Sequence, residues 1–535
     1  MTAGYLALVL HAHMPFVRHP QHEDFLEEGW LHEAILESYI PLLWMLEGLA
    51  NEGVDYRITI SLSPTLVAML GDPLLRERCA LHLERLSELA EREVLRTRHM
   101  PDFAPTARFY LQRIERARRD YEERWKRNLI LPFARLAAAG NVELITCAAT
   151  HGYLPLLAET PEVVRAQLEV GISHHLRAIG SAPRGLWLPE CGFYPGLDEL
   201  LSQAQINYTF LETHAVDYAT SAPTAGVYAP LRSPSGLTVF GRDPESTRQV
   251  WSAETGYPGD PDYREYYRDV GFDLELAALG ACAHPLGIRR NVGIKYFRVT
   301  GRTEHKEPYV RERALERAAA HAAHFSAARR RQVAELGSRL NRPPIVTAPY
   351  DAELFGHWWF EGPDWLGAVL REIARDPASL NLITPSEYMA QFPENQCAMP
   401  AASSWGHKGH SEMWLNERND WVYPHLHAAG ERMVAAARHH ARARASTCRA
   451  LNQAARELLL AQASDWAFMM SQGTTVAYAT ARTGQHLAAF RRLLDMVDSG
   501  QVDAAYLASL EAQDNLFPEL DFRCYQGAPG VPVRG

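Results

Sequence analysis

The chain has 535 residues and is therefore too long for one small core. Hydrophobic residues make up 47% of it and charged residues 22%, which are ordinary values for a globular protein. Its formal charge of −10 is spread along the sequence, without a basic stripe or a block of like charge. This distribution argues against nucleic acid and anionic membranes as partners and suits a neutral substrate.

The cysteines and the N-terminus bear on the cellular compartment. Seven cysteines are scattered singly with no CxxC pair, which is typical of reduced thiols rather than of a disulfide framework or a zinc site. The apolar run at residues 5–10 is too short for a signal peptide or a membrane span. We therefore expect a cytoplasmic protein that does not cross a membrane.

Short apolar runs that end in polar residues recur along the first part of the chain. We predict strands at residues 5–10, 57–63, 142–148, 185–189 and 207–212, a strand that opens at Ile345, and a last strand at 381–384. Residues 74–140 and 308–340 have the apolar spacing of long helices. Alternation of strand, polar tip and helix indicates parallel βα units. The expected fold is a parallel barrel or barrel-like sheet with its polar tips at the C-terminal ends of the strands.

Two stretches depart from this alternation, and the end of the chain has a different character. Residues 219–226 are small and turn-prone, which predicts a surface loop. Residues 242–269 lack a period, but their aromatic content favours a functional segment over disorder. Beyond about residue 395 only helical runs remain, at 420–444, 450–470 and 475–499, which predict a bundle packed on the barrel.

A pair of histidines follows the first predicted strand. His11 and His13 are two residues apart, so their side chains point to the same side of a strand. This spacing can hold zinc, as in a metal-dependent hydrolase or deacetylase, but the further ligands would come from scattered residues such as His151. The alternative, which we favour, is that both imidazoles hydrogen-bond a substrate or orient a carboxylate.

Acidic residues at the tips of two other predicted strands are the candidates for catalysis. Glu190 lies in GLWLPECGFYPG, whereas Asp351 and Glu353 lie in IVTAPYDAELFGHWWFEG, and spacing alone does not choose between the last two. Two carboxylates facing each other across a barrel mouth suit glycosidic-bond chemistry, with one ionised and the other protonated. A cleft lined by some of the 12 Trp and 22 Tyr residues would offer flat faces to sugar rings.

Five motifs, in order, give the sequence a specific resemblance: HAHMPF, THGYLPLL, WLPECGFYPG, PYDAELFGHWWFEG and SSWGHKGHSEMWLNE. The series resembles that of glycoside hydrolase family 57, most closely its α-1,4-glucan branching enzymes, and the similarity extends to LLLAQASDWAFMM near the end. The resemblance implies a distorted (β/α)7 TIM-like barrel in residues 1–395. It also implies an all-α C-terminal domain in residues 396–535 that contributes to the cleft.

The resemblance further implies a retaining mechanism that cleaves an α-1,4 link and transfers the chain to a 6-hydroxyl, forming an α-1,6 branch. Glu190 would be the nucleophile and Asp351 the general acid/base, with carboxyls about 5 to 5.5 Å apart. The implied partner is an α-glucan, with no cofactor and no metal, and the expected state is a monomer or weak oligomer. The residues expected to contact the substrate are His11, His13, Trp30, His151, Arg242, Trp251, His357, Trp358, Trp405, Trp414 and Asp465.

One departure from the family pattern concerns the product. Branching members often carry a mobile loop after the fifth strand, with a tyrosine that covers the site. Here the loop is reduced to residues 219–226, with Tyr218 and Tyr228 only at its edges. Because transfer depends on excluding water, the alternative functions are α-amylase-like hydrolysis and 4-α-glucanotransfer. A more remote alternative is a noncatalytic glucan-binding protein.

Overall fold

The structure, a computed structural model, describes residues 2–252 and 255–527. A parallel sheet at its centre has the strand order β4-β3-β2-β1-β8, with a short strand β9 also paired to β1. Its strands are β1 (Tyr5–Ala12), β2 (Ile58–Leu62), β3 (Val142–Cys147), β4 (Leu186–Trp187), β8 (Ile345–Asp351) and β9 (Asn381–Leu382).

A second sheet completes the barrel. It has the order β10-β6-β7-β5 and consists of β5 (Tyr208–Leu211), β6 (Leu231–Arg232), β7 (Thr238–Gly241) and β10 (Gln396–Cys397). A parallel bridge between Gly185 and Tyr208 joins β4 to β5, and Asp243 N donates to Thr347 O at 2.9 Å between β7 and β8. The ring β1-β2-β3-β4-β5-β7-β8 is therefore the predicted seven-membered parallel barrel.

The alternation of side chains along β1 explains the position of the polar tips. Tyr5, Ala7 and Val9 point into a largely aromatic barrel core that includes Trp187 and Phe210, whereas the even-numbered leucines of β1 pack outward against the helices. His11 and His13 continue the inward series beyond the point where apolar residues fill the barrel. The sequence therefore places both imidazoles at the barrel mouth.

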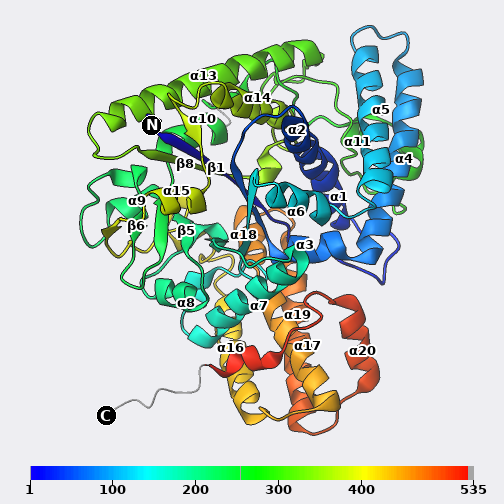
Figure 1. Ribbon diagram of the computed structural model, residues 1–535. Helices are drawn as coiled ribbons and strands as arrows, with labels where there is room; N and C mark the ends of the chain where they lie inside the picture. Colours follow the sequence, from blue (N-terminus) through cyan, green and yellow to red (C-terminus); the bar gives the residue numbers. More distant parts are fainter. Residues whose placement is uncertain (1, 253–254, 528–535) are drawn as a thin grey trace.

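Helices cover the barrel, and the ends of α4 (Pro73–Thr97) and α5 (Ala104–Arg119) project beyond it (Figure 1). The predicted helical segment 74–140 consists of three α-helices, of which α4 and α5 lie side by side. The main covering helices are α2 (Ile40–Asn51), α3 (Pro64–Gly71), α4 (Pro73–Thr97), α5 (Ala104–Arg119), α6 (Ile130–Ala138), α7 (Pro161–Ile179), α13 (Arg311–Gly337) and α14 (Gly362–Ala374).

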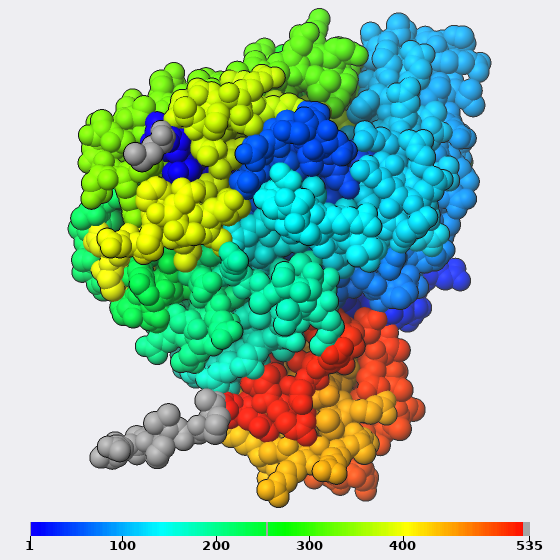
Figure 2. Space-filling model, viewed as in Figure 1, coloured from blue at the N-terminus to red at the C-terminus, as the bar shows by residue number. Residues whose placement is uncertain are grey.

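The last part of the chain is helical, and most of it forms the lower lobe in Figures 1 and 2, whereas the helix at Ser464–Gln472 lies higher, in the region of the barrel. Its helices are α16 (Val422–His439), α17 (Ala445–Ala461), α18 (Ser464–Gln472), α19 (Val476–Asp498) and α20 (Ala504–Gln513). None of the helices in the described residues is long and apolar enough to cross a membrane. The domain boundary after residue 395 stays a prediction, although β10 pairs with β6 just beyond it.

Two sequence-based expectations for this region were wrong in detail. The pattern did not predict the two-residue strand β10, which is too short to give an apolar period. The helical run 450–470 is two helices, because Ala463 is extended and pairs with Gly152 of the barrel in an antiparallel bridge. Here a tertiary contact overrides the helical periodicity.

Candidate active site

The inward faces of β1 and β8 bring a histidine and an acid together at the barrel mouth. His11 and Asp351 are register partners on these neighbouring parallel strands. Ile345 of β8 belongs to the barrel core, whereas Val346, Ala348 and Tyr350 pack outward, so Asp351, six residues after Ile345, faces the inner side. The parallel register therefore fixes the position of Asp351 relative to the histidine pair.

Glu190 follows β4 in a strained turn. Its backbone lies in the left-handed region, with φ 60° and ψ 22°, which costs a non-glycine residue about 1 to 2 kcal/mol. The Trp405 amide holds this turn by donating to the Glu190 carbonyl at 3.0 Å. The turn directs the Glu190 carboxylate into the mouth rather than along the strand.

Two side chains donate hydrogen bonds to the Glu190 carboxylate. The indole Nε1 of Trp405 lies 2.8 Å from Oε2, and the Ser464 hydroxyl lies 2.9 Å from Oε1. Burial raises the pKa of Glu190 above its usual value, and these two donors act in the opposite direction by favouring the charged form. The two donors thus favour the ionised form of Glu190, although burial and the charge of Asp465 leave its pKa above the usual value.

Asp351 has the opposite surroundings. Burial, followed by the negative charges of Glu353 and Glu190, raises the pKa of Asp351 well above its usual range, with only Arg242 opposing them. Among the described residues, no hydrogen-bond donor contacts its carboxylate. The surroundings of Asp351 therefore favour a protonated acid, whereas the hydrogen bonds to Glu190 favour an ionised one, which is the difference that a proton donor and its ionised partner require.

Glu353 is held by groups of the protein itself. It accepts hydrogen bonds from the Tyr39 hydroxyl and, at 3.1 Å, from the backbone amide of His13. A carboxylate engaged in this way fixes the loop after β1 to the turn after β8. This engagement separates Glu353 from Asp351, a distinction that spacing in the sequence did not provide.

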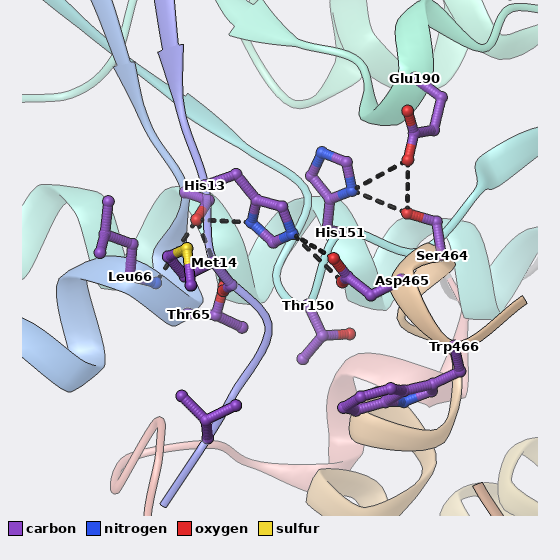
Figure 3. A network of polar contacts seen from close by, with 12 residues as sticks. His13, Met14, Thr65, Leu66, Thr150, His151, Glu190, Ser464, Asp465 and Trp466 are labelled. Atoms are coloured by element: carbon purple, nitrogen blue, oxygen red, sulfur yellow. Dashed lines mark hydrogen bonds and ion pairs between the residues drawn. The ribbon is translucent and has the colours of Figure 1, made fainter. Parts of the chain in front are cut away.

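Three histidine rings, of His11, His13 and His151, stack beside Glu190, and Figure 3 shows two of them, His13 and His151. His13 and His151 have ring centroids 3.8 Å apart, and His11 Nε2 lies 3.0 Å from His151 Nε2. Burial lowers the pKa of His11 and His151 well below the usual value, so both are neutral. Burial also acts to lower the pKa of His13, but Asp465, whose oxygens lie 3.1 and 3.2 Å from His13 Nε2, brings about a net increase.

The same residues are the candidate metal ligands. Donor atoms of His13, His151 and Asp465 lie within 4.8 Å of one another, so the fold assembles ligands that looked scattered in the sequence. Both ring nitrogens of His13 and His151, however, already have hydrogen-bond partners in the protein, including Ser63 and Ser464. This arrangement satisfies the imidazoles without a metal and favours their orienting a carboxylate.

Aromatic and cationic side chains form one wall of the mouth. The guanidinium of Arg242 lies 5.5 Å from the ring centroid of Trp405 and 5.9 Å from that of Trp251, and its Nη1 pairs with Glu212 at 2.8 Å. Trp251 and Trp405 pack edge to face. The predicted residues Arg242, Trp251 and Trp405 therefore lie together, next to the Glu190 carboxylate.

A cavity of about 780 Å³ extends this wall outward. It is lined by Trp251, by Trp358, and by the segments at residues 258–259, 264–268 and 299–304. Trp358 is 53% exposed and stacks on Tyr266 with centroids 4.3 Å apart, while His357 below it contacts Tyr266 and Glu37. The irregular polar segment thus builds a cleft with an open aromatic face.

The remaining predicted contacts lie away from the acids. Trp414 is 1% exposed and stacks on Tyr153, so in this structure it supports the loop behind Trp405 and offers no free face to a ligand. Trp30 lines a smaller cavity and packs edge to face on Tyr478. The loop at 219–226 is hydrogen-bonded to residues 396–399 rather than to the acids.

Sequence reasoning missed two side chains that hold the acids. Ser464 donates to Glu190, and Tyr39 donates to Glu353. The one feature of the sequence that could have indicated a role for Ser464 was its position next to the predicted contact Asp465, in the stretch ASDW. Nothing comparable marked Tyr39, which lies in an apolar helical run.

The chain is similar to known proteins in both its sequence and its fold. A family model described as glycosyl hydrolase family 57 matches residues 7–400, and one described as 1,4-alpha-glucan branching enzyme, C-terminal, matches residues 425–525. The 1,4-alpha-glucan branching enzyme of Thermococcus kodakarensis is 33% identical over 96% of this chain and 77% of its own length.

Two solved structures cover nearly the whole chain. The alpha-amylase AmyC from Thermotoga maritima has a TM-score of 0.92 and 42% identity, covering 98% of this chain and 99% of that chain. The GH57-type branching enzyme from Pyrococcus horikoshii has a TM-score of 0.88 and 34% identity, covering 99% of this chain and 98% of that chain.

Proposed function

Because the chain belongs to glycosyl hydrolase family 57, we propose that it is a retaining 1,4-α-glucan branching enzyme with Glu190 as nucleophile and Asp351 as general acid/base. The observation that carries this proposal is the contrast between the two acids. Glu190 accepts hydrogen bonds from Trp405 and Ser464, whereas burial and two nearby carboxylates favour the protonated form of Asp351. The branching activity named for the Thermococcus and Pyrococcus relatives supports the choice of product.

In the first step, Asp351 gives its proton to the glycosidic oxygen as the C1–O4 bond breaks. Glu190 attacks C1 from the opposite face and forms a covalent glycosyl ester, while the rest of the donor chain leaves with a new 4-hydroxyl. Asp465 raises the pKa of His13 and so favours its protonated form, and a protonated imidazole at this position favours the ionised form of Glu190 until the attack.

In the second step, the ionised Asp351 takes the proton of a 6-hydroxyl on an acceptor glucan. The resulting oxygen attacks C1, the ester to Glu190 breaks, and an α-1,6 branch forms with retained configuration. Attack by water at the same stage would give hydrolysis. The ratio of the two products therefore depends on how well the acceptor excludes water from the cleft.

Hydrolysis is the second candidate function, and two observations favour it. The structure with a TM-score of 0.92 bears the name of an α-amylase. The loop at residues 219–226 packs on residues 396–399 and does not contact Glu190 or Asp351 in the described part of the chain. 4-α-Glucanotransfer would use the same covalent intermediate with a 4-hydroxyl as acceptor.

Further parts of the proposal concern the cellular setting. The substrate would be amylose or a glycogen-like polymer, so that the reaction belongs to glycogen biosynthesis. We place the protein in the cytoplasm as a monomer or weak oligomer, with no nucleic acid or membrane partner. The seven free cysteines and the dispersed charge support this setting.

The test is the product formed from amylose. A branching enzyme should yield short side chains after treatment with a debranching enzyme, with little increase in reducing ends. A large increase in reducing ends without α-1,6 links would replace branching by hydrolysis. Retention of glucan binding by Glu190→Gln, with loss of turnover, distinguishes an enzyme from a glucan-binding protein.

A further inference from the structure

Ser464 is in the helical region but lies against the candidate nucleophile of the barrel (Figure 3). We propose that Ser464 is a positioning residue for Glu190, as the last member of a hydrogen-bond chain whose direction is set by the charge on that carboxylate. The inference rests on the function proposed above, in which Glu190 is the nucleophile. It assigns part of the catalytic apparatus to the helical region.

The hydroxyl of Ser464 has two partners and a single hydrogen. Its oxygen lies 2.9 Å from Glu190 Oε1 and 2.8 Å from His151 Nδ1. An ionised carboxylate can only accept, so Ser464 donates to Glu190. The same oxygen must then accept from His151, which fixes the proton of that imidazole on Nδ1.

This assignment determines the rest of the chain. A neutral His151 with its proton on Nδ1 has an accepting Nε2, so the His11 Nε2 at 3.0 Å must donate to it. His11 Nδ1 is then an acceptor, and the Ser61 hydroxyl donates to it at 3.1 Å in preference to the Thr146 carbonyl at 3.4 Å. All four members of the chain are buried. Because burial holds the pKa of His11 and His151 well below the usual value, both rings stay neutral.

The polarity of the chain opposes a proton on Glu190. A proton between Glu190 and Ser464 would make the carboxyl a donor, and every hydrogen bond back to Ser61 would have to reverse, with both histidines changing tautomer. The glycosyl ester, in contrast, keeps a carbonyl oxygen that accepts from Ser464 without any reversal. The chain therefore suits the ionised carboxylate and the covalent intermediate, and not the protonated acid.

Backbone contacts fix the position of Ser464. Its amide donates to the His151 carbonyl at 3.0 Å, and the preceding Ala463 forms a bridge with Gly152. Ser464 is the first residue of α18, so the N-terminal end of this helix also lies next to Glu190, where its partial positive charge favours an anion. The packing of the helical region on the barrel thus delivers the donor.

The experiment compares Ser464→Ala with Ser464→Thr, which keeps the hydroxyl. We expect Ser464→Ala to lower kcat/KM about 10- to 100-fold, as for a lost hydrogen bond to a charged group, without weakening glucan binding. In the pH profile of kcat/KM for Ser464→Ala, the acidic limb should move to higher pH. The reason is that the hydrogen bond lost in this variant favours the ionised form of Glu190. Ser464→Thr should restore most of the rate and the original limb.

Two further variants serve as a control and as an independent test. Ser471 lies on the same helix as Ser464, but its hydroxyl contacts Asn416. Ser471→Ala should therefore leave kcat/KM unchanged. Ser61→Ala removes the first donor of the chain and should shift the acidic limb in the same direction by less. The inference would be overturned if the acidic limb of the pH profile stayed in place in both Ser464→Ala and Ser61→Ala. It would also be overturned if Ser464→Ala and Ser464→Thr lost kcat/KM equally.

Hydrolysis of an aryl α-maltoside should be the assay, because it requires Glu190 whatever the acceptor. If the wild type forms no α-1,6 links, the branching proposal fails but the Ser464 comparison still has a rate to measure. If Glu190→Gln retains turnover, the nucleophile assignment fails and the inference fails with it. The two failures are therefore distinguishable.

Discussion

The indole of Trp405 donates to the Glu190 carboxylate at 2.8 Å, and its backbone amide donates to the Glu190 carbonyl at 3.0 Å. One residue of the loop that follows the barrel thus holds both the strained turn and the side chain of the nucleophile. This double contact joins parts of the sequence that lie 215 residues apart.

The first prediction concerns this contact. Trp405→Phe removes the indole donor but keeps an aromatic ring, so kcat should fall about 10- to 100-fold while KM for amylose changes little. Steady-state kinetics would measure both constants. Trp421→Phe, at the exposed start of α16, is the matched control. A change confined to KM would show that Trp405 binds glucan without assisting Glu190.

The second prediction separates Asp351 from Glu353. Asp351→Asn should lower the rate about 10²- to 10⁴-fold for substrates with poor leaving groups and much less for activated aryl glycosides, which need no protonation. Glu353→Gln should affect both substrates equally, because Glu353 holds Tyr39 and His13. A leaving-group dependence found in Glu353→Gln instead would exchange the two assignments.

The same pair predicts a pH dependence. Activity should rise as Glu190 ionises and fall as Asp351 loses its proton, and burial raises the pKa of both groups. The optimum should therefore lie above the ordinary range of carboxyl groups. Asp351→Asn should remove the alkaline limb, and a retained limb would assign it to another group.

The third prediction concerns the outer cleft. Trp358→Ala removes an exposed ring stacked on Tyr266 and should raise KM for long amylose about fivefold, with kcat unchanged, if the ring binds sugar faces. Short substrates that do not reach the cleft should be unaffected. Leu95→Ala, exposed on α4, is the control. Equal effects on long and short substrates would contradict this role.

The fourth prediction distinguishes the imidazole interpretation from a metal site. Protein treated with a chelator and then freed of it should keep its full rate, because the nitrogens of His13 and His151 already have protein partners. Metal analysis before and after treatment gives the occupancy. Loss of activity that returns with zinc would assign a metal to these residues.

Local patterns in the sequence predicted much of the barrel. Alternation along β1 predicted that His11 and His13 share a side, and the predicted strands lie where the structure has them, although β7 of the barrel ring was not among them. The pattern did not reveal the contact between Ser464 and Glu190, which joins residues 274 apart, or the burial of Trp414 under Tyr153. These depend on how the helical region packs on the barrel, which no local period encodes.

The most direct test of the retaining site is to identify the residue that becomes glycosylated. A 5-fluoro-α-maltosyl fluoride should accumulate the covalent intermediate, because fluorine slows its breakdown while the fluoride leaving group needs little acid assistance. Peptide mapping by mass spectrometry should then find the sugar on Glu190 in the wild type and in Asp351→Asn. A label on any other residue, or rapid turnover to a product of inverted configuration, would contradict the account.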